Sequence, residues 1–329
     1  MTSASENDYQ ENEDKPPGGL QVLISPYLKR LSKKSRAVRK EFYPSESEKI
    51  VSRLSFVDPL LEDEHTKTKG LVHKYKTRVL ILLTMTCASY CRFCTRRRIV
   101  GDLRKGTISP QDIDRMVLYL KKHHEVSEVI FSGGDPLTVP ALLSLAVKKI
   151  TQLTTIKVIR IHTRVPVSNP FLINQKILNI FKSVKKQPLY ISIHFEHPDE
   201  FTRETVRAVE KIRKTGAILL SQSVFLKGIN DSYETLNKLF TGLVEIGIRP
   251  YYIYHCDPVK GASHFIVPLE KEIEIMTKLK TNLSGIACPA FVIDTPNGSG
   301  KIPVPFNYWS FQKNNYCDYN GDIISIQKS

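Results

Sequence analysis

The sequence predicts an α/β protein in which parallel strands form an incomplete (β/α)6 barrel, preceded by an N-terminal helical extension. Two observations lead to this fold. Short runs rich in apolar and β-branched residues recur along the chain, and segments with helical spacing of apolar residues separate them. Such alternation is typical of a parallel sheet covered by helices, and six units suit an open, curved sheet better than a closed eight-fold barrel. The runs are VLILLT (79–84), EVIFS (128–132), KVIRIHT (157–163), LYISIHF (189–195), ILLSQSV (218–224) and PYYIYH (250–255).

Two of the intervening helices have clear start signals. Ser109 and Pro110 suit an N-cap and a first helical turn. The apolar residues that follow at helical spacing are Ile113, Met116, Val117 and Leu120. Further along, Asp231 and Glu234 resemble a capping box. The apolar stripe behind that box consists of Leu236, Leu239, Phe240 and Leu243.

Composition divides the chain into four segments. Residues 1–18 carry five acidic side chains and no basic one before Lys15, so we expect a disordered acidic tail. Residues 19–76 are expected to form helices and loops, and residues 77–265 the barrel. Residues 266–329 form a C-terminal segment. At 329 residues the chain is long enough for one large α/β domain.

The chain is basic, with a formal net charge of +15. Seven positive residues lie between Lys29 and Lys40. Because no exposed aromatic pattern is interleaved with them, a solvated helix face is favoured over a contact patch for a polyanion, and nucleic acid is not an expected partner. The polar start MTSASENDYQ has no signal region, and no run approaches the ~18 apolar residues of a membrane span. We therefore expect a cytoplasmic protein that does not bind membranes.

Three cysteines crowd into one loop after the first predicted strand. Cys87, Cys91 and Cys94 follow a C-x3-C-x2-C spacing in TCASYCRFC. A structural zinc site needs four closed ligands, and no fourth thiol or histidine lies nearby in sequence. Three cysteines suit a [4Fe–4S] cluster that leaves one iron open to a small molecule. This spacing is the signature of radical S-adenosylmethionine (SAM) enzymes, in which SAM binds the open iron.

A glycine-containing turn follows the second predicted strand. Ser132, Gly133, Gly134 and Asp135 stand in FSGGDP, where the glycines allow a ligand close to the backbone and the carboxylate can receive an ammonium group. The carboxyl ends of barrel strands are where sites form. These four residues are therefore candidates to bind the methionine end of SAM.

From about residue 56 to residue 325 the chain resembles lysine 2,3-aminomutase, a radical SAM family that depends on pyridoxal phosphate. The stretches that carry the resemblance are GLVHKYKTRVL, CASYCRFCTRRR, IFSGGDPL, IRIHTRVPV, HFEHPDEFT, SQSVFLKGIND, RPYYIYHCD, SHF and FVIDTPNGSGKIPV. The resemblance implies a radical 1,2-amino migration that converts lysine to β-lysine. It also implies a [4Fe–4S] cluster, SAM and pyridoxal 5′-phosphate as cofactors.

Roles for individual residues come with that resemblance. Lys301, after Asn-Gly-Ser-Gly, matches the lysine that holds pyridoxal phosphate as a Schiff base. Lys74 and Tyr75 match positions near the cofactor phosphate, and lysine replaces the arginine that is usual at position 74. His194 and Gln222 match residues that contact SAM.

Substrate selection is assigned in the same way. Arg96 matches the arginine that binds the substrate carboxylate, for which a planar guanidinium is suited. Asp257 and Asp294 match two carboxylates that hold the ε-ammonium group of lysine. Two converging acids would repel each other unless a cation bridged them, which favours a dibasic substrate.

One departure from the family concerns zinc. Longer members bind a structural zinc through a cysteine after the I-N-D stretch and a cysteine-rich tail. Here Ser232 stands at the first position and that tail is absent, so no zinc is predicted. Because those elements belong to subunit contacts in longer relatives, a homo-oligomer is allowed but its contacts are not implied. The remaining cysteines, without ligand-like spacing, are Cys256, Cys288 and Cys317.

Alternative functions remain open. A shorter relative could supply β-lysine for modification of elongation factor P, and a related aminomutase could act on glutamate or arginine. From another class, the charge and the cluster could mark an iron–sulfur protein that binds or modifies RNA. The aminomutase interpretation further requires a reducing electron donor of the flavodoxin or ferredoxin type.

Overall fold

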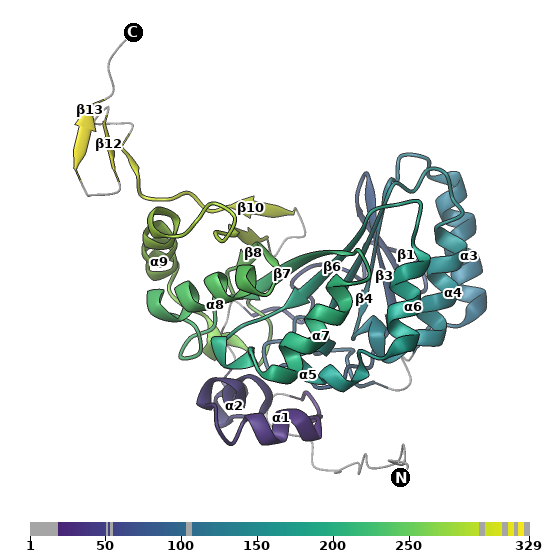
Figure 1. The fold of residues 1–329 in the computed structure, drawn as a ribbon, viewed down its shortest axis with the longest axis horizontal. Coiled ribbons are helices and arrows are strands. Elements are labelled where there is room, and N and C mark those ends of the chain that lie inside the picture. Colours follow the sequence, from purple (N-terminus) through teal and green to yellow (C-terminus); the bar gives the residue numbers. More distant parts are fainter. Residues whose placement is uncertain are drawn as a thin grey trace.

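One open, curved sheet dominates the molecule (Figure 1). Within the part of the chain that the structure describes, ten strands form this sheet in the order β1 to β10, so that neighbours in sequence are neighbours in the sheet. The edge strands β1 and β10 do not pair with each other, which confirms the predicted incomplete barrel. This computed structural model describes residues 19–50, 52, 55–102, 107–295, 300–310, 315–318 and 322–325. The tail predicted to be disordered lies outside these residues.

The six predicted strands are present and parallel, and each agrees with its prediction within one residue at either end. They are β3 (Arg78–Thr84), β4 (Glu128–Gly133), β5 (Val158–Thr163), β6 (Leu189–His194), β7 (Ile218–Val224) and β8 (Arg249–Tyr254). The sheet continues beyond them. β9 (Ala290–Asp294) adds a further parallel strand beside β8, and β10 (Lys301–Pro303) returns antiparallel to β9. Both strands lie in the segment 266–329 that was predicted to be separate from the barrel, and both are short.

The segment preceding the barrel is only partly helical. α1 (Pro26–Leu31) and α2 (Arg36–Phe42) match the expectation, but β1 (Thr66–Thr68) and β2 (Leu71–Tyr75) form the first edge of the sheet. β2 pairs antiparallel with β3 and buries its first two residues. Residues 66–75 therefore belong to the sheet rather than to the predicted loops, because a short connection lets β2 fold back on β3.

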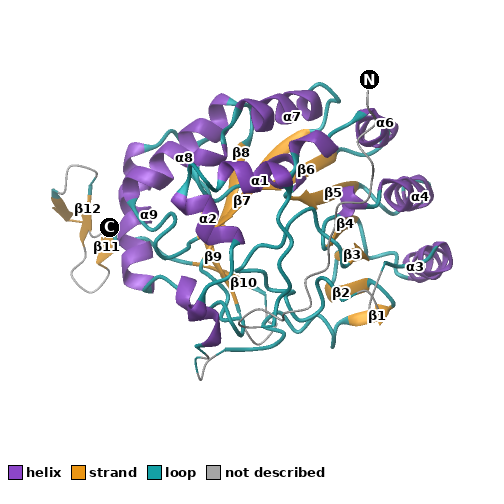
Figure 2. Cartoon of the chain, turned by 90° about the horizontal axis from the view of Figure 1, so that it is seen from below, coloured by secondary structure: helices purple, strands orange, loops and turns teal. Residues whose placement is uncertain are grey.

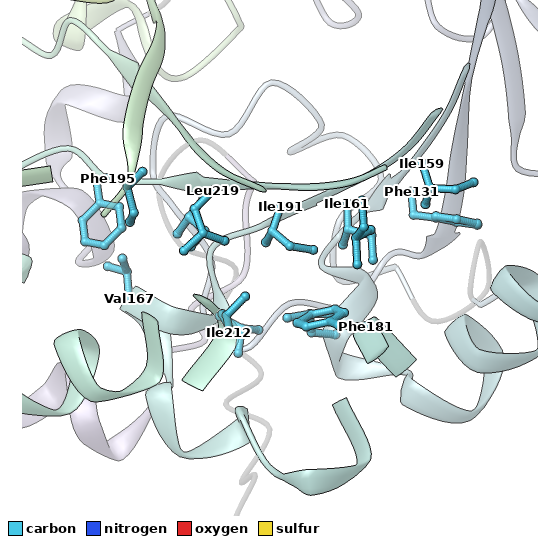
Figure 3. Close-up of a cluster of buried hydrophobic side chains, with 14 of the residues drawn as sticks. Phe131, Ile159, Ile161, Val167, Phe181, Ile191, Phe195, Ile212 and Leu219 are labelled. Atoms are coloured by element: carbon cyan, nitrogen blue, oxygen red, sulfur yellow. The ribbon is translucent and has the colours of Figure 1, made fainter. Parts of the chain in front are cut away.

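Helices cover the convex face of the sheet, as the view in Figure 2 shows. They are α3 (Pro110–Lys122), α4 (Pro140–Ile150), α6 (Gln175–Ser183), α7 (Arg203–Arg213), α8 (Tyr233–Glu245) and α9 (Leu269–Asn282). Between the helices and the sheet lies a continuous apolar core, in which side chains of Phe131, Ile191 and Phe181 are fully or nearly fully buried (Figure 3). Burial of this apolar area supplies the main driving force for the fold.

The two predicted helix starts have different outcomes. Ser109 caps α3 as predicted, and Asp112 completes a capping box. At α8 the prediction was wrong by one residue: Ser232 is the N-cap, and its hydroxyl accepts from the Thr235 amide. The carboxylate of Asp231 instead accepts from the Gly228 amide and pairs with a lysine of α9, so it is not available to cap the helix.

Strand periodicity decides which side chains face the concave side of the sheet. In β5, Ile159 and Ile161 are buried in the core beneath the helices, whereas Arg160 and His162 line a cavity on the opposite face. Successive residues of a strand point to opposite faces, so every parallel strand presents apolar residues outward and can present polar residues inward. The site is built on this inner face.

Smaller elements complete the fold. α5 (Val165–Ser168) follows β5 directly, and a separate three-stranded sheet near the C-terminus consists of β11 (Trp309–Ser310), β12 (Asn315–Cys317) and β13 (Ile323–Ser325). Among the described residues, no helix has both the length and the apolar character needed to cross a bilayer.

Candidate active site

A cavity of about 350 Å³ lies on the concave face of the sheet. Its size is that of a small-molecule site. Each strand from β2 to β10 contributes at least one lining side chain, and the loop after β3 closes part of the wall. All the site residues predicted from the sequence line this one cavity: Lys74, Tyr75, Cys87, Cys91, Cys94, Arg96, Ser132, Gly133, Gly134, Asp135, His194, Gln222, Asp257, Asp294 and Lys301.

The three clustered cysteines lie in the loop between β3 and α3, and their thiols are free. Arg164, at the start of α5, donates from Nη1 to Cys91 Sγ over 2.8 Å. Burial raises the pKa of all three thiols, to about 12 for Cys91, while the charge of Arg164 acts in the opposite direction there. A nearby cation is what three buried thiolates need if they are to bind a metal.

Three cysteines on one short loop are a donor set that fits an iron–sulfur cluster. Within the described residues, no group of three or more His, Cys, Asp or Glu side chains is arranged to hold one metal ion. The three cysteines of an iron–sulfur cluster each bind a different iron, so they stand farther apart than ligands of one ion. Three free thiols on one short loop, facing a cavity, are consistent with that arrangement.

A buried ion network holds the cysteine loop in place. Arg92 is fully buried and donates from Nε and Nη2 to the two carboxylate oxygens of Glu48, at 2.8 and 2.6 Å. Arg97 Nη2 donates to the same carboxylate at 2.7 Å. Because Glu48 and Arg92 are both fully buried, removal of Glu48 would leave the Arg92 guanidinium without its carboxylate partner. This network could not be predicted from the sequence, because Glu48 and Arg92 are 44 positions apart in the chain.

The glycine pair at the end of β4 permits close contact with the start of the cysteine loop. A Cβ atom at Gly133 would lie 2.3 Å from the carbonyl oxygen of Thr84, and one at Gly134 would lie 2.3 Å from that of Thr86. The amide of Gly134 donates to the Thr84 carbonyl over 2.6 Å. Gly133 also has a φ of +126°. Both positions therefore require glycine because backbone passes directly over backbone.

Asp135 organises the neighbouring turn. Its carboxylate accepts from the Thr163 hydroxyl at 2.9 Å and from the backbone amides of Arg164, Val165 and Leu137 at 2.7, 3.2 and 3.1 Å. Burial raises the pKa of Asp135 to about 6, although these hydrogen bonds oppose the shift. The carboxylate already accepts hydrogen bonds from all these donors. Binding of the SAM amino group by Asp135 stays a prediction.

An acid–amine pair lies at the other edge of the sheet. Lys301 of β10 and Asp294 of β9 are cross-strand partners, and Lys301 Nζ donates to Asp294 Oδ2. Lys74 Nζ approaches the second oxygen, Oδ1, to 3.8 Å. The ring of Tyr254 lies below Lys301 Nζ, 5.4 Å from its centroid. The Asn-Gly-Ser part of the predicted turn lies outside the described residues, whereas Gly300 accepts from the Thr295 amide.

Asp257 contributes a second carboxylate without an ion pair. Burial, followed by the charge of Asp294, raises the pKa of Asp257 to about 7, and Lys301 and Lys74 act in the opposite direction. No described residue forms a salt bridge with its carboxylate. A carboxylate in this state gains from any cation that enters the cavity.

Arg96 is paired with a residue that sequence analysis missed. Its Nε and Nη2 donate to the two carboxylate oxygens of Glu62, at 2.8 and 2.6 Å. Its Nη1 lies 3.4 Å from Ser132 Oγ and 3.2 Å from the Gly133 carbonyl oxygen. A substrate carboxylate could therefore reach the planar edge of Arg96 only by displacing Glu62.

His194 and Gln222 are neighbours in the register of β6 and β7. Gln222 Nε2 donates to Tyr254 Oη over 2.9 Å, and His194 Nδ1 lies 3.3 Å from a carboxylate oxygen of Glu196. Burial lowers the pKa of His194 to about 4, so the imidazole is neutral near pH 7. A neutral imidazole and an amide can form hydrogen bonds with an uncharged heterocycle.

Comparison with known proteins identifies the family. The Radical SAM superfamily matches residues 81–239, from β3 into α8. The chain is 39% identical over 300 residues to L-lysine 2,3-aminomutase of Acetoanaerobium sticklandii, which covers 90% of this chain and 72% of that protein. It is 38% identical to the Clostridium subterminale enzyme of the same name, over 88% of this chain and 70% of the relative. The chain belongs to the lysine 2,3-aminomutase family.

The family assignment agrees with the fold. Among solved structures, a radical SAM methyltransferase from Sphaerobacter thermophilus matches with a TM-score of 0.50 and 14% identity over 68% of each chain, a likeness of fold alone. As a radical SAM protein, this lysine 2,3-aminomutase homologue belongs to a group that uses a [4Fe–4S] cluster and SAM. The three cysteines predicted to bind the cluster and the residues predicted to bind SAM line one cavity.

Several cavity residues were not anticipated. Arg78, Arg160, His162 and Tyr254 all line the cavity. Arg160, His162 and Tyr254 lie on predicted strands at inward-facing positions, so the alternation of the strands could have identified them. Arg78 lies one residue before the first predicted strand, at the start of β3. Glu62 lies in an irregular segment, where no periodic signal marks it.

Proposed function

We propose that this protein is an L-lysine 2,3-aminomutase, an isomerase that moves the α-amino group of lysine to the β-carbon. One observation carries the proposal: the cysteine loop and the Asp294–Lys301 pair line the same cavity. The first suits radical initiation and the second suits binding of an amino acid as an imine. Relatives named for this reaction support lysine as the substrate.

Pyridoxal phosphate is the third cofactor in this proposal, with Lys301 as its attachment site. The lysine amine faces the cavity from a short hairpin, and Arg78 and Lys74 bring two more cations to the same wall. Tyr75 Oη is buried without a hydrogen-bond partner among the described residues, which suits a donor that awaits a ligand oxygen. Two cations lie near its ring, with Arg78 Cζ at 3.8 Å and Lys74 Nζ at 5.7 Å from the centroid. These groups fit a phosphate ester.

The cofactors supply the reactivity and the chain supplies position. When bound, the cluster and SAM provide one-electron hydrogen abstraction, and pyridoxal phosphate holds the migrating amino group. Arg96 binds the substrate carboxylate with a planar, two-point contact after Glu62 moves aside. Fixing that end of the substrate orients its β-carbon toward the cysteine loop, which lies next to Arg96 in the sequence and in the cavity wall.

The opposite end of the substrate is bound by two acids. Asp257 has no ion-pair partner, and Asp294 Oδ1 is buried without a hydrogen-bond partner in the described residues. An ε-ammonium group placed between them satisfies both and removes their mutual repulsion. A glutamate side chain would add a third negative charge there, so the pair favours lysine over glutamate.

SAM binding is assigned to Ser132, Gly133, Gly134 and Asp135 on one side and to His194 and Gln222 on the other. Because the two glycines have no side chains, the ligand can approach the backbone closely. Because His194 is neutral, it places no positive charge beside the sulfonium. A cytoplasmic location, an external electron donor and assembly into a homo-oligomer stay predictions from the sequence.

The test is anaerobic reconstitution with iron, sulfide, pyridoxal phosphate and SAM, followed by separation of the products of labelled lysine. Lys301→Ala should abolish both conversion and the visible absorbance of bound pyridoxal phosphate. Lys148→Ala, an exposed lysine of α4, is the matched control and should change neither. Conversion that survives Lys301→Ala removes the pyridoxal assignment.

The substrate clamp needs a separate variant. Asp257→Asn should raise the KM for lysine by at least tenfold, because a buried charge-assisted contact contributes about 1.5–3 kcal/mol. The absorbance of bound pyridoxal phosphate should stay, since Lys301 is intact. An unchanged preference for lysine over glutamate would contradict the role of this acid.

A further inference from the structure

A dense basic surface covers the outside of the two N-terminal helices. Seven cations lie on α1, on α2 and on the turn between them, and all are exposed. We call them the basic face: Lys29, Arg30, Lys33, Lys34, Arg36, Arg39 and Lys40. The acid of this stretch, Glu41, is buried and pairs with Arg164. The positive charge of the face is therefore not offset within its own helices.

The cations also lack acidic partners from elsewhere. None of the seven forms a salt bridge with a carboxylate in the described part of the chain. Lys40 donates to the Gly228 carbonyl oxygen, and Arg39 Cζ lies 4.7 Å from the ring centroid of Tyr43. Seven cations held within 12 successive positions create a local positive potential, which attracts an acidic partner and speeds its association.

The inner side of the same helices, together with the segment just before α1, contacts the cysteine loop. Tyr90 N donates to the Leu23 carbonyl oxygen over 2.9 Å, and Arg92 N donates to that of Glu41 over 2.8 Å. The Cys91 side chain packs against the apolar cluster that α1 and α2 bury. A helix with its side chains is about 10–12 Å across, so the basic face lies about one helix diameter from the nearest cysteine.

We propose that the basic face is the docking surface for an acidic, low-potential electron-transfer protein. This inference rests on the proposed function, because the cluster must be reduced before SAM can be cleaved. The donor loses one electron and the cluster gains it, and no bond forms or breaks in that step. Docking on α1 and α2 puts the two redox centres on opposite sides of a single layer of helix. In this proposal, the helix face that was expected from the sequence to be solvated binds a protein partner.

A protein suits this surface better than RNA. The aromatic side chains within the two helices, Tyr27 and Phe42, are buried, so in the described structure α1 and α2 themselves offer no exposed ring on which bases could stack. The position of the basic face over the cysteine loop would bring a docked electron donor close to the cluster. Nucleic-acid binding does not require that position.

The test compares two variants of equal charge change. Lys33→Glu/Lys34→Glu reverses two exposed cations of the basic face, and Lys121→Glu/Lys122→Glu reverses two exposed cations at the end of α3. Each reconstituted enzyme is titrated with an FMN-containing bacterial flavodoxin, and the Kd is measured at about 50 and about 200 mM salt. We expect about tenfold weaker binding and a smaller salt dependence for the first variant, with the second within about twofold of wild type.

Three results would overturn the proposal. The first is an equal loss of flavodoxin affinity in both variants. The second is no flavodoxin binding by the wild type at low salt. The third is that the wild type binds transfer RNA more tightly than flavodoxin and that the first variant loses the same affinity for transfer RNA. Activity driven by dithionite provides the separation from the proposed function. It should be unchanged in both variants, since the small reductant needs no docking surface. If the wild type is inactive with dithionite yet binds flavodoxin through the basic face, the aminomutase assignment fails and the docking surface stands.

Discussion

The glycine pair beneath the cysteine loop allows steric crowding to be separated from backbone strain. At Gly134 an added Cβ meets only crowding, with the Thr86 carbonyl oxygen at 2.3 Å. At Gly133 it meets the same crowding from Thr84 and also a φ of +126°. Gly216 has a φ of +86° and nothing within 4 Å of the added Cβ, so it isolates the strain.

These geometries give an ordered set of stability losses. A non-glycine residue at positive φ costs about 1–2 kcal/mol, so Gly216→Ala should lower the free energy of unfolding by that amount. Crowding of a packed site costs about 1–3 kcal/mol, which is the expectation for Gly134→Ala. Gly133→Ala combines both and should lose about 2–5 kcal/mol. Gly285→Ala meets neither and should stay within about 0.5 kcal/mol of wild type.

Chemical denaturation of the four variants measures these differences, and iron and sulfide content after reconstitution gives a second readout. In Gly133→Ala and Gly134→Ala the added Cβ displaces the backbone at Thr84 and Thr86, just before the cysteines. Both variants should therefore retain less iron and sulfide. Gly216→Ala lies far along the chain, after α7, and should retain a full complement. The reasoning is refuted if Gly134→Ala is as stable as Gly285→Ala, or if Gly216→Ala loses as much iron as Gly133→Ala.

Three further predictions concern buried charge. Glu62→Gln should lower the KM for lysine several-fold in steady-state assays, because Arg96 then receives a substrate carboxylate without displacing another; a higher KM would contradict this. Asp257 has a folded pKa of about 7, above its ordinary 3.8, so the wild type loses stability as pH rises between these values. The melting temperature of Asp257→Asn relative to wild type should therefore increase from pH 5 to pH 8, and a pH-independent difference would disprove the shift. Glu48→Gln should cost about 3–5 kcal/mol in urea unfolding, whereas the exposed Glu46→Gln should cost under about 1 kcal/mol.

The parts of the fold that repeat could be predicted from the sequence. The six strands were found because apolar runs recur with a regular spacing, and the cysteine loop was found because its ligands are close in the chain. β9 was missed because a run of five residues after a long helix gives little periodic signal. The capping residue of α8 was misplaced by one position, because Asp231 and Ser232 are both good N-caps and a tertiary contact to Lys271 decides between them.

Contacts between distant segments limit how much of the site can be predicted from the sequence. The Asp294–Lys301 pair could be anticipated, since seven positions separate the residues across a glycine-containing turn. The pairing of Arg96 with Glu62 could not, because 34 residues separate them and Glu62 belongs to no regular element. A role carried over from the family assigns a residue to a ligand. It does not reveal which protein group forms a hydrogen bond or ion pair with that residue.

Charge balance links these contacts to substrate choice. The polar side chains on the inner face are buried or half-buried, and a buried charge without a partner is unfavourable. Two cations of the cavity are accordingly paired with acids: Lys301 with Asp294 and Arg96 with Glu62. Asp257 stands outside this scheme and carries the raised pKa that such isolation produces. A substrate with both a carboxylate and a distal ammonium group can exchange partners at Arg96 and supply the cation that Asp257 lacks, which a neutral or acidic side chain cannot do.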